Sequence, residues 1–69
     1  MLQDYLKKYR MKHNLSQNQM AELLGTSQSY YSRLETGANR AGHSMIVSIA
    51  YHCGVSESYI SKLVYENHK

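Results

Sequence analysis

Residues 16–37 read SQNQMAELLGTSQSYYSRLETG, and this stretch decides the fold. Ser16, followed three residues later by Gln19, has the pattern of a capping box and predicts that a helix begins at about Gln17. Gly25 can take the left-handed conformation that commonly ends a helix, because it has no Cβ. The first part of the stretch therefore predicts a helix from about Gln17 to Leu24.

The second part of the stretch predicts another helix directly after the glycine. Thr26 or Ser27 can cap its first amides, and Gly37 is placed to end it. Tyr31 and Leu34 are three residues apart, so they share the face that should pack inward. The stretch thus predicts two short helices joined by a tight turn.

Three further helices are expected around these two, which makes the fold all-α. The first should carry Leu2 and Leu6 inward and stop near Asn14, a residue that tolerates the left-handed conformation. A loop is expected over 38–43. We expect the whole chain, residues 1–69, to form one domain with a polar tail from Glu66.

The fourth and fifth helices repeat the pattern of the second and third. Residues 49–63 match residues 20–34, with Gly54 in the place of Gly25 and Ser56 in the place of Ser27. Gly54 should therefore end the fourth helix, and Ser56 should cap the fifth. The apolar residues expected on these two helices are Met45, Ile46, Ile49, Ala50, Cys53, Tyr59, Ile60, Leu63 and Val64.

The composition of the chain is basic. Eight Lys and Arg stand against five Asp and Glu, giving a net charge of +3, and no acidic residue lies between Asp4 and Glu22. This balance favours a polyanionic partner, although a basic run of this kind is also common on a solvated helix face. The single cysteine excludes an internal disulfide, and no apolar stretch approaches the roughly 20 residues of a membrane span.

Residues 16–35 resemble the helix-turn-helix of the XRE-type family, to which Cro and the lambdoid phage repressors belong. The resemblance is carried by Leu15-Ser16-Gln17, Met20-Ala21, Gly25, residues 27–35 and Gly37, and it extends to Ile49-Ala50 and Gly54-Val55-Ser56. It implies a five-helix, lambda-repressor-like fold in which the second helix crosses the DNA backbone and the third enters the major groove.

The resemblance also implies a function. We expect a sequence-specific transcriptional regulator, a repressor and not an enzyme, that binds double-stranded DNA as a weak dimer strengthened on a pseudo-palindromic operator. It should need no cofactor or metal and have no membrane partner. We expect it in the cytoplasm of a bacterium, encoded there or by a phage or plasmid, and on the nucleoid when bound.

The polar face of the third helix supplies the expected base contacts. It offers hydroxyl, amide and guanidinium groups and no acid, and Arg33 suits guanine as Gln28 suits adenine. The expected base-contacting residues are Gln28, Ser29, Ser32 and Arg33. Contacts to the DNA backbone are expected from Gln17, Asn18, Ser27, Tyr30, Asn39, Arg40 and Arg10.

Two further assignments follow from the resemblance. Relatives tie the first helix to the end of the third with an arginine and a glutamate, here Arg10 and Glu35, although Arg10 could instead or also contact a phosphate. Relatives dimerise through the segment after the third helix and through the fifth helix, a surface that here would include Arg40, His43, Glu57 and Ile60. The chain departs from the family pattern over 38–44, which leaves the start of the fourth helix open.

Other functions have weaker support in the sequence. His43, His52, Cys53 and His68 lack the spacing of a metal site, and no phosphate loop or Ser-His-acid arrangement is recognisable. The main alternative is a protein-interaction module of the same fold, an antirepressor or antitoxin, for which Leu23, Tyr51, Tyr59 and Tyr65 could form a contact surface. A second alternative is the DNA-binding fragment of a longer repressor.

Overall fold

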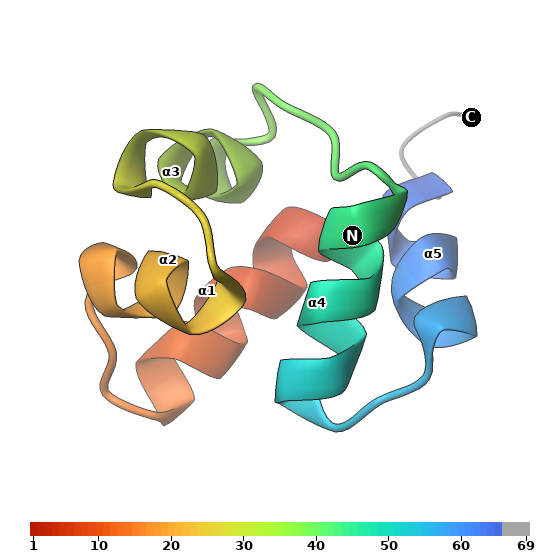
Figure 1. Ribbon diagram of the computed structural model, residues 1–69, viewed down its shortest axis with the longest axis horizontal. Coiled ribbons are helices and arrows are strands. Elements are labelled where there is room, and N and C mark those ends of the chain that lie inside the picture. Colours follow the sequence, from red (N-terminus) through yellow and green to blue (C-terminus); the bar gives the residue numbers. More distant parts are fainter. Residues whose placement is uncertain (66–69) are drawn as a thin grey trace.

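The computed structural model describes residues 1–65, and within them the chain forms five helices and no strand (Figure 1). The helices are α1 (Leu2–Lys12), α2 (Gln17–Leu24), α3 (Gln28–Thr36), α4 (His43–Cys53) and α5 (Glu57–Tyr65). The predicted all-α fold, with a helix-turn-helix at α2 and α3, is confirmed. The tail expected from Glu66, and His68 within it, lie outside the described residues.

Both ends of α2 have the predicted chemistry. The backbone N–H of Gln19 donates to Ser16 Oγ at 3.0 Å, and the N–H of Ser16 donates to Gln19 Oε1 at 2.8 Å, so the capping box is complete. Gly25 ends the helix at φ 75° and ψ 34°, in the left-handed region. Of the two candidate caps for α3, Ser27 is the one used: its Oγ accepts from Tyr30 N at 3.1 Å.

The turn between α4 and α5 has the same construction. Gly54 is left-handed at φ 71°, and Ser56 Oγ accepts a hydrogen bond from Tyr59 N at 3.0 Å. The repeat seen in the sequence therefore corresponds to a repeated helix-turn-helix geometry. The first pair of helices has an additional link: the start of α2 and the C-terminal end of α3 are joined to α1 through the side-chain hydrogen bonds of Glu35 described below.

One core joins the five helices. Its largest fully buried side chains are Leu6, Met20, Tyr31, Leu34, Ile49, Ile60 and Val64. α1 packs on α3 and α5, and α4 packs on α2 and α5, so α1 and α4 together support the helix-turn-helix from behind. Ser48 Oγ adds a hydrogen bond to the Leu24 carbonyl oxygen at 3.0 Å, which ties α4 to the end of α2.

The start of α4 differs from the expectation. His43, placed in the loop by the sequence, is the first residue of the helix, and Gly42 is its N-cap with φ −81° and ψ −179°. No side chain caps this end. A glycine at this position allows the extended cap conformation but provides no oxygen for the first amides.

The uncapped start of α4 generates a stability prediction. Gly42→Ser should raise the free energy of unfolding by about 0.5 kcal/mol, because the backbone is already extended, nothing lies within 4 Å of an added Cβ, and the hydroxyl can accept from the first turn. Gly54→Ser makes the same chemical change at φ +71° and should lower it by about 1 kcal/mol. Urea unfolding followed by circular dichroism measures both. Equal losses in the two variants would contradict the capping argument.

Candidate nucleic-acid interface

The outer face of α3 brings the four expected base-contacting residues together. Gln28, Ser29 and Arg33 are exposed and Ser32 is partly exposed. Gln28 and Ser32, like Ser29 and Arg33, are four residues apart, so each pair lies on one side of the helix, and Ser29 and Arg33 are opposite the buried Tyr31. The face carries hydroxyl, amide and guanidinium groups and no carboxylate.

The segment that follows α3 folds back onto Arg33. The backbone N–H of Asn39 donates to the Arg33 carbonyl oxygen at 3.2 Å. In the amide orientation that satisfies both groups, Arg33 Nε donates to Asn39 Oδ1 at 3.1 Å, and Asn39 Nδ2 donates to the Ala38 carbonyl oxygen at 3.2 Å. The bond uses Nε alone, so Asn39 steadies the guanidinium while its terminal nitrogens remain for a bidentate contact.

The other candidate backbone contacts come from α2, from the start of α3 and from the segment after α3. Asn18 is exposed in the first turn of α2, Ser27 caps α3, and Arg40 is exposed in the segment after α3, with its guanidinium carbon 5.9 Å from the centre of the Tyr65 ring. Tyr30 is half-buried and packs against the core. In Figure 1, α3 lies at the outside of the molecule with α2 beneath it and the segment over 37–42 beside its end.

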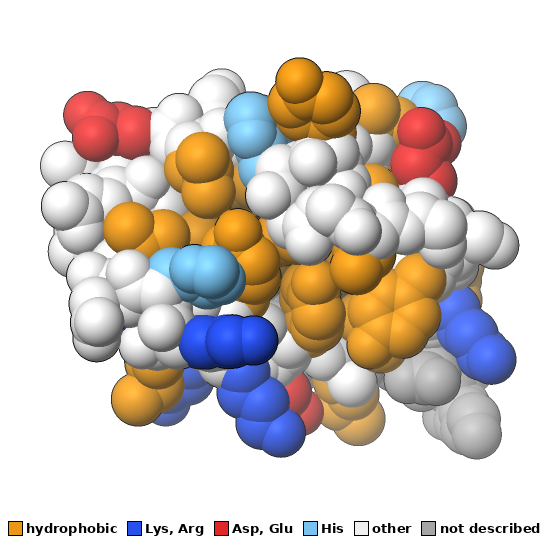
Figure 2. Space-filling view, turned by 90° about the horizontal axis from the view of Figure 1, so that it is seen from below, with side chains coloured by type: hydrophobic (Ala, Val, Ile, Leu, Met, Phe, Trp, Pro, Cys, Tyr) orange, Lys and Arg blue, Asp and Glu red, His pale blue; other side chains and the backbone are white. Residues whose placement is uncertain are grey.

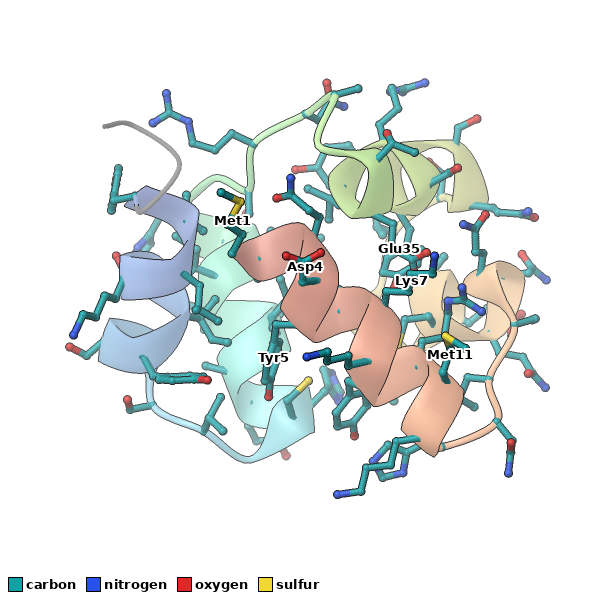
Figure 3. The ribbon with its side chains drawn as sticks, turned by 180° about the vertical axis from the view of Figure 1, so that it is seen from behind. Met1, Asp4, Tyr5, Lys7, Met11 and Glu35 are labelled. Carbon is teal, nitrogen blue, oxygen red and sulfur yellow. The ribbon has the colours of Figure 1, made fainter. Side chains whose placement is uncertain are left out.

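Behind α3, the Glu35 carboxylate accepts hydrogen bonds from three helices. Arg10 of α1 donates from Nε to Glu35 Oε2 at 2.6 Å and from Nη2 to Oε1 at 3.2 Å. Gln17 of α2 donates from Nε2 to Oε1 at 3.2 Å, and the Tyr31 hydroxyl of α3 donates to Oε2. Figure 3 shows Glu35 where α3 faces α1. The carboxylate therefore connects α1, α2 and α3.

The charge state of this cluster follows from its contacts. Burial favours the neutral acid, but the hydrogen bonds from Arg10, Tyr31 and Gln17 outweigh it and hold the pKa of Glu35 below its usual value. Burial, and then the hydrogen bond to Glu35, raise the pKa of Tyr31, and the hydrogen bond to Glu35 raises the pKa of Arg10. At neutral pH the cluster is a carboxylate held by a guanidinium, a neutral phenol and an amide.

The structure adds detail on three of the residues named from the sequence. Arg10 also donates from Nη1 to the Leu15 carbonyl oxygen at 3.1 Å, so its guanidinium is held by Glu35 and Leu15, and a further contact from Arg10 to a phosphate stays a prediction. The Gln17 side chain turns to Glu35, which leaves its backbone N–H as the group able to meet a phosphate. Ile60 has no exposed surface, so its side chain cannot belong to a dimer surface.

The sequence missed the polar role of Tyr31. It was expected only to fill the core, yet its hydroxyl donates to Glu35. The spacing of four residues on one helix was the available signal, because such residues lie on the same face. No signal in the sequence indicated the Gln17–Glu35 hydrogen bond, which joins residues on two different helices.

A groove between the segment after α3 and α5 brings together the remaining dimer candidates. Its volume is about 710 Å³, and Arg40, His43 and Glu57 line it together with Lys62 and Tyr65.

Within residues 1–65, no three His, Cys, Asp or Glu side chains are arranged to hold a metal ion. In the same part of the chain, no helix has the length and apolar character needed to cross a bilayer.

Comparison with known proteins identifies one family. The family model described as Helix-turn-helix matches residues 6–60. This range begins within α1, ends within α5 and contains every candidate DNA contact named above. No curated protein and no solved structure matches the chain.

The Glu35 cluster generates a prediction about stability. Glu35→Ala leaves the Arg10 charge in the protein without its partner and should lower the free energy of unfolding by about 3–5 kcal/mol, because the Glu35 side chain is 5% exposed and the Arg10 side chain 18%. Glu22→Ala removes an exposed carboxylate of α2 and is the control, with little change expected. Urea unfolding measures both, and an unchanged midpoint for Glu35→Ala would show that the pair does not form in solution.

The pH dependence of stability, compared between the wild-type protein and Glu35→Gln, gives an independent check. The pKa of Glu35 is lower in the folded than in the unfolded protein, so its contribution is complete above the unfolded value of about 4.3 and is lost as the pH falls through the folded value. The wild-type protein should therefore lose stability more steeply than Glu35→Gln below about pH 5. If the stability of the two proteins fell equally steeply with pH in this acid range, the assignment would be contradicted.

Proposed function

The chain belongs to the XRE-type helix-turn-helix family of DNA-binding transcription regulators, and from this premise we propose that it is a repressor that reads the major groove with α3 as a dimer on a pseudo-palindromic operator. The observation that carries the proposal is the outer face of α3, where Gln28, Ser29, Ser32 and Arg33 are gathered without an acid. The family is one of regulatory domains and not of enzymes. Repression needs only occupancy of a promoter, which binding alone supplies.

Base reading falls to the two longest side chains of this face. A guanidinium can make two hydrogen bonds to O6 and N7 of guanine, and a carboxamide can make two to N6 and N7 of adenine, which assigns Arg33 to guanine and Gln28 to adenine. Ser29 and Ser32 are short and would approach base edges only where the helix lies deep in the groove. The hydrogen bond from Arg33 to Asn39 reduces the freedom that the guanidinium loses on binding.

Backbone contacts would hold the duplex against this face. The first amides of α2, including that of Gln17, point along the helix axis and favour a phosphate oxygen. Asn18, Ser27, Tyr30, Asn39 and Arg40 supply further donors around α3. Such contacts carry no sequence information, but they fix the position of α3 in the groove.

Dimerisation would use the groove between the segment after α3 and α5. One recognition helix covers too few base pairs to select a site among a genome of competitors, so a second copy is needed. The groove contains charges of both signs: Arg40 and Lys62 are positive and Glu57 is negative. A two-fold contact must be self-complementary, and a surface with both signs of charge can meet a second copy of itself. The contact is small, so DNA should strengthen a weak dimer by raising the local concentration of the second copy.

Base reading by Arg33 can be tested on a site selected from random duplex DNA. Arg33→Ala should weaken binding to the selected site by about 1–3 kcal/mol and leave binding to random DNA nearly unchanged. Asn18→Ala, the control, should weaken both by similar factors because it removes a candidate phosphate contact that lies outside the proposed dimer groove. Gel-shift titrations give the four affinities. Equal losses for Arg33→Ala on both DNAs would assign Arg33 to the backbone, and failure to select any sequence would overturn the proposed function.

The dimer can be tested on the same site by sedimentation and footprinting. Two copies should bind half-sites of opposite orientation whose centres are about 34 Å apart. Glu57→Gln should weaken occupancy of the full site several-fold and leave a single half-site unaffected, whereas Glu22→Gln should change neither. A single copy bound with full affinity, or a preference for direct repeats, would contradict the dimer.

A further inference from the structure

A second pocket lies on a part of the surface that the DNA-binding proposal does not use. Tyr5, Lys8, Tyr9, Lys12, His13 and Cys53 line it, and its volume is about 480 Å³. It lies between the C-terminal half of α1 and the end of α4. None of its lining residues is acidic, although two are lysines and one is a histidine. Figure 2 views the molecule from below, with hydrophobic side chains over its middle and Lys and Arg side chains mainly in the lower part of the view.

The floor of the pocket is a fixed aromatic cluster. The Tyr5 ring meets the Tyr59 ring edge to face, with centroids 5.8 Å apart, and the Tyr9 ring lies 4.2 Å from the ring of His13. The Tyr9 hydroxyl donates to the His52 carbonyl oxygen at 3.4 Å, which ties α1 to the end of α4. These contacts hold the rings in place before any ligand arrives, which lowers the entropic cost of binding.

The floor is also uncharged. Burial, with the neighbouring Cys53 thiol, raises the pKa of Tyr5 to about 12, and burial raises the pKa of Cys53. Both groups are therefore neutral at physiological pH. The pocket thus combines a neutral, largely aromatic floor with a rim that carries the charges of Lys8 and Lys12.

The position of the pocket separates it from the recognition helix. Figure 3 shows Tyr5 pointing away from α3, toward the end of the molecule where α4 meets α5. None of the pocket residues is among the candidate DNA contacts. A ligand seated there would leave the face of α3 uncovered.

We propose that this pocket docks an acidic segment of a partner protein, with an apolar side chain of the segment between Tyr5 and Tyr9 and its carboxylates beside Lys8 and Lys12. The two features of the pocket together select this chemistry. An anion alone has no use for the aromatic floor, and an apolar ligand alone has no use for the cationic rim. A pocket of about 480 Å³ holds a few side chains, whereas a duplex backbone requires a track of positive charge.

Docking of a partner at this pocket would add to the proposed DNA-binding function, and it does not require DNA to be bound. Because the pocket and α3 are on different parts of the surface, a repressor bound to its operator could hold the partner there at the same time. The exposed Tyr59 beside the pocket, with 46% of its surface accessible, would extend the contact. Aromatic side chains at the centre and polar side chains at the rim are the usual distribution in protein interfaces.

The experiment uses a synthetic peptide in which one tryptophan is flanked on both sides by aspartates. The protein contains no tryptophan, so tryptophan emission reports the peptide alone. Titration of the peptide with protein should give a saturable blue shift as the indole enters the pocket. Lys8→Glu should weaken this binding about fivefold to tenfold, because an attraction becomes a repulsion. Lys7→Glu is the matched control: it gives the same net charge from an exposed lysine of α1 outside the pocket, and little weakening is expected.

Further measurements test whether something other than an acidic segment binds the pocket. Addition of the selected DNA duplex should leave the peptide bound, and displacement would overturn the proposal by placing the pocket in the DNA interface. Absence of saturable binding, or equal weakening by Lys7→Glu and Lys8→Glu, would also overturn it. Self-association that Lys8→Glu abolishes in the absence of peptide would reassign the pocket to a second copy of the chain. Failure of DNA binding alone would overturn the proposed function and leave the docking result standing.

Discussion

The position of α3 depends on the carboxylate of Glu35. It accepts hydrogen bonds from Arg10 on α1, Gln17 on α2 and Tyr31 on α3, and these helices otherwise meet through apolar side chains. Apolar packing tolerates small rotations and shifts at little cost, whereas directed hydrogen bonds to one carboxylate do not. A paired charge of this kind adds little net stability over an apolar replacement, so its main contribution here is to orientation. The face of α3 is thereby fixed relative to the first amides of α2.

That orientation matters for the base recognition proposed for α3, because reading base edges requires accurate placement of side chains. Arg33 lies two residues before Glu35, so a rotation of α3 that displaced the carboxylate would also move the guanidinium away from a base edge. Ser27 and Gly37 fix where the helix begins and ends, and Asn39 holds Arg33 from the following segment. The same residues that stabilise the fold therefore prepare the interface. The duplicated turn at Gly54 lacks an equivalent cluster among the described contacts, which is consistent with a supporting role for α4 and α5.

The sequence predicted what short-range chemistry determines. The capping box at Ser16, the left-handed glycine at Gly25 and the cap at Ser27 depend on neighbouring residues alone, and each has the expected geometry. The Gln17–Glu35 hydrogen bond was not predictable, because it depends on how α2 and α3 cross. Ile60 was misplaced for a related reason: α5 has apolar residues at 59, 60, 63 and 64, and only tertiary packing decides that Ile60 and Val64 face the core. The surface assignment of a short, largely apolar helix needs the structure.

The arrangement of charge explains how a chain of 69 residues can keep several surfaces distinct. Within residues 1–65 no buried polar side-chain atom lacks a hydrogen-bond partner, and outside the Glu35 cluster the charged side chains lie at the surface. The five helices are short, and each presents a different part of its circumference to solvent. The outer face of α3 is polar and free of acid, the groove beside α5 carries both signs of charge, and the pocket beside α1 joins lysines to aromatic rings. A duplex, a second copy and an acidic segment have different chemistry, and so each fits one of these surfaces better than the other two.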